Sequence, residues 1–185
     1  PKICPHLHVP LQSGSDAVLA SMQRHYDAHR YARTIQQARA ELPALNLTTD
    51  IIVGYPDEDD AAFADTLAFA REMGFTKVHA FPFSARRGTP LADRDPIDKA
   101  VKAERSRQLR AQADELAITH RARLVGQRDE VLVEARASAG YGASAGVLLT
   151  DDHVAAGNDM SGEQPAPRSP QLTGYTRDYS PVLLA

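Results

Sequence analysis

The stretch "LTTDIIVGYPDEDD", Leu47–Asp60, indicates the fold class of this 185-residue chain. Aliphatic and β-branched side chains run from Leu47 to Val53, which is typical of a buried parallel strand. Gly54 and Pro56 end this strand, and a series of acidic side chains follows, where they would complement the dipole of a new helix. The stretch therefore predicts a strand, a turn and a helix in series.

The same order of elements occurs three times in residues 1–96. "ICPHLHVPL" precedes the turn "QSGSD", and the later strand "TKVHAFPFS" leads into the loop "ARRGTP". Three such units predict a parallel sheet or part of a (β/α) barrel. Because active sites of these folds lie at the carboxyl ends of the strands, we expect the site at "QSGSD", "GYPDED" and "SARRGTP".

The remainder of the chain predicts two further parts. Residues 97–123 read as one long helix with seven basic and four acidic side chains. A polyanion would most plausibly be met here, although charge alone favours a solvated helix face. Residues 124–185 read as a small all-β module, with a flexible insertion at 156–171. We thus expect divisions at 1–96, 97–123 and 124–185.

Composition narrows the classes of protein. The single cysteine, Cys4, excludes a disulfide framework and any metal or cluster site made of cysteines alone within this chain. No apolar run approaches the roughly 20 residues of a membrane helix. With no recognisable signal peptide, we expect a cytoplasmic protein. The chain begins at Pro1 rather than methionine, so we expect a fragment.

His6 and His8 suggest a metal site. Alternate residues of a strand face the same way, so both imidazoles could reach one ion, as in metal-dependent hydrolases. The further ligands would have to be Asp50 and His79, which lie well before the ends of their strands. We therefore expect no metal site and predict histidines that are hydrogen-bonded inside a barrel; a metal hydrolase is the weaker alternative.

The three turns offer other chemistry. Gln12, Ser13 and Gly14 precede a helix, where backbone N–H groups bind anions or polar ligands, and Gln12 can both donate and accept. Gly54 permits close approach of the backbone to a flat ring. Arginines in the loop after the third strand favour a phosphate-bearing partner.

Taken in order, "PLQSGSDAVLASMQRHY", "LTTDIIVGYPDEDDAAFADT" and "VHAFPFSARRGTP" resemble consecutive stretches of the radical S-adenosylmethionine methylthiotransferases. These enzymes add a methylthio group to C2 of a hypermodified adenosine at tRNA position 37, beside the anticodon. "DEVLVEA" and "LTGYTRDYSPVLL" resemble TRAM, the small RNA-binding β-barrel that ends those proteins. The resemblance implies an α/β fold, the C-terminal half of a partial (β/α) radical-SAM barrel, followed by a TRAM barrel.

The resemblance also implies a subgroup. Ser13 stands where a branch that modifies a ribosomal protein tends to have histidine, which favours the tRNA branch. "ICPHLH" looks most like the enzymes acting on N6-threonylcarbamoyladenosine, with the isopentenyladenosine type as the alternative. A non-catalytic RNA-binding fragment is a further alternative. The family's usual Gly-Glu after the Gly-Tyr-Pro turn is Asp57-Glu58 here.

The cofactors implied are S-adenosylmethionine and [4Fe–4S] clusters, whose ligands would lie upstream, so this chain alone is expected to be inactive. The partners implied are the tRNA anticodon stem-loop and donors of sulfur and electrons, with no membrane. No catalytic or metal-binding residue is assigned. The residues expected to bind the cofactor are Gln12, Ser13, Gly14, Arg24, Asp50, Ile52, Val53 and Gly54, and those expected to bind RNA are Ser84, Arg86 and Arg87.

Overall fold

The computed structural model describes residues 3–136, 148–149 and 172–184. The chain divides into two compact units, one of residues 7–117 and one of residues 1–6 with 118–185. All residues expected to bind a cofactor or RNA belong to the first unit. The boundary falls within a helix, and the predicted divisions after residues 96 and 123 remain predictions.

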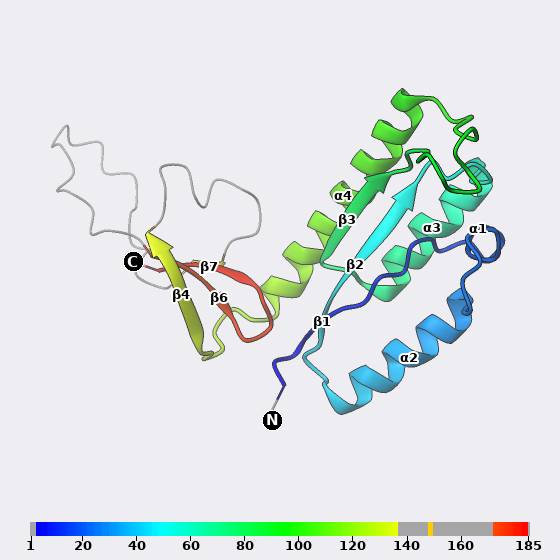
Figure 1. Cartoon of the computed structure of the whole chain (residues 1–185). Helices are drawn as coiled ribbons and strands as arrows, with labels where there is room; N and C mark the ends of the chain where they lie inside the picture. Colours follow the sequence, from blue (N-terminus) through cyan, green and yellow to red (C-terminus); the bar gives the residue numbers. More distant parts are fainter. Residues whose placement is uncertain (1–2, 137–147, 150–171, 185) are drawn as a thin grey trace, which may run out of the picture. The chain divides into compact units, whose positions relative to one another are not determined.

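The first unit is built on a three-stranded sheet (Figure 1). Its order is β1 (His6–His8), β2 (Asn46–Val53) and β3 (Lys77–Pro82), and β2 and β3 run parallel. The strands predicted around "LTTDIIV" and "TKVHAFP" are therefore present, in the predicted parallel arrangement. Within the described ranges the strands form an open sheet rather than a closed barrel, which fits an α/β fragment.

Aspartate side chains cap the beginnings of two helices, and a glycine ends one of them. The helices of the described residues are α1 (Asp16–Ser21), α2 (Ala28–Glu41), α3 (Asp60–Met73) and α4 (Lys99–Ala122). The carboxylates of Asp27 and Asp59 accept hydrogen bonds from the first turns of α2 and α3. Gly74, at φ 65°, ends α3 in the left-handed conformation that glycine favours. None of these helices is both long and apolar enough to cross a membrane.

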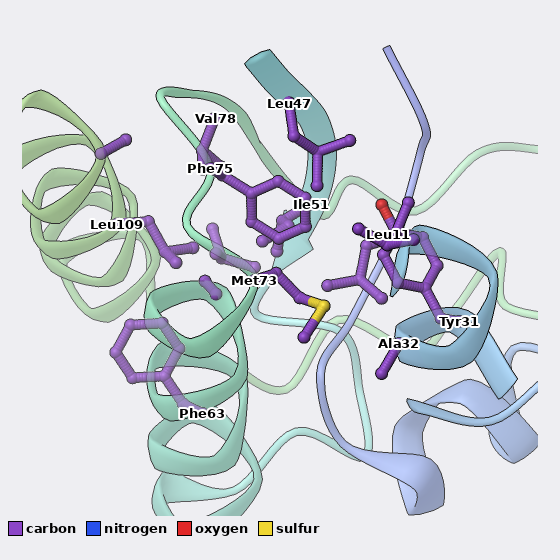
Figure 2. Close-up of a cluster of buried hydrophobic side chains, with 14 residues drawn as sticks. Leu11, Tyr31, Ala32, Leu47, Ile51, Phe63, Met73, Phe75, Val78 and Leu109 are labelled. Carbon is purple, nitrogen blue, oxygen red and sulfur yellow. The ribbon is translucent and has the colours of Figure 1, made fainter. Parts of the chain in front are cut away.

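One face of the sheet packs against the helices. Leu47, Ile51 and Val53 of β2 are at most 1% exposed and lie in the same cluster as side chains from α2, α3 and α4 (Figure 2). Asp50 and Ile52 alternate with them and are only half-buried. The carboxyl-terminal half of the strand is thus covered on one face only, whereas its aliphatic run predicted burial on both. Asn46 and Thr48, earlier on the other face, are buried. Other members of this core are Leu11, Tyr31, Ile35, Phe63, Met73, Phe75, Val78 and Leu109.

The second unit contains a small sheet. Its order is β4 (Val131–Arg136), β6 (Leu172–Thr176), β7 (Pro181–Leu184) and β5 (Leu148–Leu149), in which β4, β6 and β7 are antiparallel neighbours and β5 runs parallel to β7. The predicted strands at both ends of this region are confirmed. The described residues form an open sheet and not the predicted closed barrel, and the insertion predicted at 156–171 lies outside them.

Candidate functional site

The turn after β2 is held together by a buried ion pair. Gly54, at φ 71°, donates its N–H to Glu58 Oε1 at 2.8 Å, and Arg105 Nη1 donates to the same oxygen at 2.7 Å. Arg105 also donates to the backbone carbonyl of Glu58 and to the carboxylate of Asp60. Burial raises the pKa of Glu58 above its ordinary value, against the lowering effect of Gly54 and Arg105. The turn that resembles the family motif is therefore fixed from α4.

The close approach that Gly54 permits is made by α4. A Cβ at residue 54 would lie 2.4 Å from Cγ of Lys102. The buried Lys102 ammonium donates to the carbonyl of Phe83 at 3.0 Å and pairs with Asp95. Glycine is thus needed here for packing inside the chain, whereas the sequence suggested a ring of a ligand.

The "QSGSD" turn is divided between a buried and an accessible part. The Ser13 hydroxyl lies 3.2 Å from the Thr66 hydroxyl of α3, which also accepts the N–H of Gly14 at 3.1 Å. A Cβ on Gly14 would lie 2.7 Å from Cα of Thr66. Ser13 and Gly14 therefore anchor the turn to α3, whereas Gln12 is half-exposed and accessible to a ligand.

Gln12 is fixed to the sheet by its backbone. Its N–H donates to the carbonyl of Asp50 at 2.8 Å, and its carbonyl accepts from the N–H of Ile52 at 2.9 Å. Its φ of 73° is unusual for a residue other than glycine and is maintained by these two bonds. The structure thus brings Gln12, Asp50 and Ile52 together along the carboxyl-terminal half of β2, whereas Val53 lies in the core and Arg24 is exposed on the segment after α1.

The open face of the sheet has both polar and apolar residues. In the register of β2 and β3, Asp50 lies opposite His79 and Ile52 opposite Phe81, whose side chain is 52% exposed. His8 of β1 lies 3.3 Å from Asp50 through Nε2, and its ring meets that of His79 edge-on. Ile52 and Phe81 therefore form an apolar pair on this face. His8 is hydrogen-bonded, as expected, although the face that carries it is open.

Asp57 connects the turn after β2 to the end of α1 and to the segment between β3 and α4. Its carboxylate accepts a hydrogen bond from the Ser21 hydroxyl at the end of α1 and pairs with Arg94, at 2.8 Å, in the segment between β3 and α4. The Ser21 hydrogen bond and the Arg94 guanidinium lower the pKa of Asp57. Asp57 replaces the glycine usual in the resembling family, and here it gives the turn two additional contacts.

The predicted RNA-binding residues lie in the loop after β3. Ser84, Arg86 and Arg87 are all exposed, and the carbonyl of Arg86 accepts the Thr89 hydroxyl at 2.7 Å in a turn. By contrast, two basic residues of the helix expected to meet a polyanion are buried. Lys102 and Arg105 are at most 5% exposed and are neutralised by carboxylates of the chain itself.

Sequence reasoning did not identify Glu58 and Arg105 as a buried ion pair. It also did not identify Thr66 as the residue that anchors "QSGSD". Arg105 and Glu58 are 47 positions apart, so no local spacing connects them. One signal was available. Lys102 and Arg105 are three residues apart, which places them on the same face of a helix as Leu109.

A small cavity of about 320 Å³ lies between β3 and α4. Its polar lining comes from Lys77 and His79 on β3 and from Arg110 and Asp114 on α4, and Phe81 contributes an aromatic wall. The volume is at the lower end of the range for small-molecule sites. None of the residues expected to bind a cofactor or RNA contributes to it.

Searches for relatives give a consistent set of names. The chain is 44% identical over 134 residues to a tRNA-2-methylthio-N(6)-dimethylallyladenosine synthase of Parafrankia sp. (strain EAN1pec), a match covering 72% of this chain and 27% of the relative. The enzyme of that name from Rhodococcus jostii (strain RHA1) is 43% identical over 136 residues, 73% of this chain and 27% of the relative. Synthase 1 of Mycobacterium marinum (strain ATCC BAA-535 / M) is 44% identical over 136 residues, 73% of this chain and 26% of the relative. No family model matches the chain.

These names correct the predicted subgroup. The short stretch "ICPHLH" pointed to enzymes of the threonylcarbamoyladenosine type, whereas these relatives are all named for dimethylallyladenosine, the isopentenyl type. Agreement over 134 residues outweighs six residues at the start of the chain. The chain spans about a quarter of the length of the curated relatives it matches. Over that part, its similarity supports membership of the tRNA methylthiotransferase family.

Proposed function

We propose that this chain is part of an enzyme that adds a methylthio group to C2 of N6-dimethylallyladenosine in tRNA, next to the anticodon. The observation that carries the proposal is the 44% identity over 134 residues to a synthase named for that product. The ordered motifs "LQSGSD", "IVGYPDE" and "FSARRGTP" agree with it, because the structure places the first two at the same end of the sheet, where Gln12 bonds to Asp50 and Ile52.

The residues at this end fit part of S-adenosylmethionine. This cofactor has an adenine ring, ribose hydroxyls and an amino-acid group. Ile52 and Phe81 provide exposed apolar surface for a ring, the Gln12 amide can donate and accept, and the Asp50 carboxylate can accept from a hydroxyl or an ammonium. When bound, S-adenosylmethionine supplies the methyl group and the radical chemistry of this enzyme class. In this proposal the chain forms one wall of its site.

The roles of the other predicted residues differ. Ser13, Gly14, Val53 and Gly54 shape the wall from behind, because each is buried. Arg24 is exposed and would reach a carboxylate only from the edge of the wall. Ser84, Arg86 and Arg87, all exposed, are proposed to contact tRNA phosphates.

An iron–sulfur cluster does not fit the residues present in this chain. A cluster of the [4Fe–4S] type needs several cysteine thiolates, and the sequence has Cys4 alone. We therefore assign no step of the reaction on a cluster to these residues. The proposal places the cluster ligands, and the donors of sulfur and electrons, outside this sequence.

The function is tested by deleting the gene that encodes this chain and analysing the nucleosides of total tRNA by mass spectrometry. We expect loss of 2-methylthio-N6-dimethylallyladenosine and accumulation of N6-dimethylallyladenosine, while threonylcarbamoyladenosine derivatives stay unchanged. Complementation with the complete gene should restore the product. If the 2-methylthio nucleoside persists after deletion, the proposed function is wrong.

The site is tested in the same complemented strain. Gln12→Ala should lower the 2-methylthio nucleoside at least about ten-fold, because the amide would be one of few polar contacts to the cofactor. Gln36→Ala, an exposed glutamine on α2, is the matched control and should restore the product fully. Equal complementation by the two variants would refute the assignment of Gln12.

A further inference from the structure

The open face of the sheet carries three potential metal ligands side by side. The three residues are His8 of β1, Asp50 of β2 and His79 of β3. One potential ligand atom from each side chain lies within 4.8 Å of the other two. Asp50 and His79 are direct partners in the strand register. Their position in the middle of the strands argued against a metal at the barrel mouth. Their pairing across the strands nevertheless places them together.

The imidazole of His8 is already oriented for this role. Its Nδ1 lies 3.0 Å from the Thr48 hydroxyl, and its Nε2 faces the Asp50 carboxylate at 3.3 Å. Histidines that bind metals commonly use one ring nitrogen for the ion and bond the other to a neighbouring polar group, which fixes the orientation of the ring. Thr48 is 5% exposed and therefore provides a fixed support for the ring.

The three ligand atoms must move closer together to hold one ion. At a tetrahedral ion, metal–ligand bonds of about 2.0–2.1 Å place two ligand atoms about 3.4 Å apart, so a pair separated by the full 4.8 Å must close by about 1.4 Å. His79 is exposed, and its ring packs against His8 and Phe81 at centroid distances of 5.8 and 6.5 Å. Because the His79 imidazole is exposed, rotation of its side chain can supply this closure.

We propose that His8, Asp50 and His79 bind a divalent transition-metal ion of the zinc class on the open face of the sheet. Two imidazoles and one carboxylate favour Zn²⁺ over Mg²⁺ and Ca²⁺, which prefer sites made of oxygen ligands. Three protein ligands leave at least one position open for water or another ligand. This proposal goes beyond the methylthiotransferase function and does not depend on it. Both proposals use the Asp50 carboxylate, and an ion bound through one oxygen leaves the other oxygen for S-adenosylmethionine.

The test is a titration of the 185-residue chain with metal alone. The protein is stripped with EDTA and carries Cys4→Ser, because the exposed thiol could bind metal by itself. We expect one Zn²⁺ per chain by isothermal calorimetry, and a visible absorption spectrum with Co²⁺. Asp50→Asn and His79→Gln should each weaken Zn²⁺ binding at least about ten-fold, while the double variant His25→Ala/His29→Ala should leave it unchanged.

The double variant distinguishes a built site from incidental binding, since His25 and His29 are exposed and remote in sequence from the three ligands. If it abolishes Zn²⁺ binding while Asp50→Asn and His79→Gln do not, the proposal is wrong. Thr48→Val should also weaken binding about ten-fold, through loss of the Nδ1 support. Far-UV circular dichroism and thermal unfolding establish that the variants remain folded, so that a lost affinity reports on the ligands.

Discussion

Gly54→Ala tests whether α4 fixes the turn after β2. Gly54 has φ 71°, and an added Cβ would lie 2.4 Å from Lys102 Cγ and 2.9 Å from Lys102 Cε. Gly88 offers a matched control, because its φ is 81° and nothing lies within 4 Å of an added Cβ. The two positions share the left-handed backbone and differ in what surrounds them.

The expected magnitudes follow from this difference. A side chain at φ near +70° costs about 1–2 kcal/mol, so Gly88→Ala should lower the free energy of unfolding by that amount. At Gly54 the overlap with Lys102 adds the cost of overpacking, about 1–3 kcal/mol, which gives about 2–5 kcal/mol in total. In a Lys102→Ala background the overlap disappears, and Gly54→Ala should then cost only about 1–2 kcal/mol.

Urea unfolding followed by far-UV circular dichroism measures the four chains of the double-mutant cycle and the Gly88→Ala control. The cycle subtracts the separate cost of removing the Lys102 ammonium from Asp95 and the Phe83 carbonyl. The reasoning is refuted if Gly54→Ala costs no more than Gly88→Ala. It is equally refuted if the Gly54 cost is the same with lysine and with alanine at residue 102.

Three further outcomes can be measured. Arg105→Met should destabilise the chain by about 3–5 kcal/mol at pH 7, because it leaves the buried Glu58 carboxylate without its cation. The loss should be smaller near pH 4, where Glu58 accepts a proton. Urea titrations at both pH values measure the difference. The pKa of Asp178 is held at about 2, because hydrogen bonds from His120, Thr176 and Ser180 outweigh the opposing effect of burial. Asp178 therefore contributes about 2 kcal/mol to the free energy of unfolding above pH 4, and this contribution is lost as the pH falls towards 2. Thermal unfolding of Asp178→Asn should lack that part of the acid dependence. Asp57→Gly should speed amide exchange around Arg94 but change global stability by less than about 1 kcal/mol, because their ion pair is exposed.

Local signals were sufficient for most elements of the first unit. The run from Leu47 to Val53 predicted β2, because this strand signal depends on nearby residues only. The long helix expected at 97–123 is α4, Lys99–Ala122. In the second unit, local patterns located β4, β6 and β7, but a closed barrel depends on pairing across the whole unit.

The open face of β2 was not predicted because the alternation in the sequence is incomplete. Thr49 is polar and yet points into the buried layer, where its hydroxyl donates to the carbonyl of Val9 and accepts from the N–H of Leu11. Ile52 is apolar and yet lies on the open face. These two residues hide the period of two that would have marked Asp50 as facing outward.

Charge alone was misleading for α4. A helix rich in lysine and arginine is more often solvated or bound to a polyanion than buried, and this reading applied to Lys102 and Arg105 as well. Their partners, Asp95 and Glu58, are 7 and 47 positions away and come together with them only in the folded chain. Before the tertiary contacts are known, the signal for their burial is their position on the helix face that carries Leu109, and their partners cannot be identified.

The turn after β2 is preorganised by contacts from two sides. On the buried side, Glu58 and Arg105 hold the Gly54 backbone, and on the exposed side Asp57 bonds to Ser21 and Arg94. A ligand that binds beside such a turn loses little free energy in ordering it, because the turn is already in place. The substitution of aspartate for the family's usual glycine at residue 57 therefore does not loosen this turn. Asp57 makes two specific contacts with the neighbouring segments, where a glycine would leave the backbone freer. These contacts support a binding role for the end of the sheet beside the turn after β2.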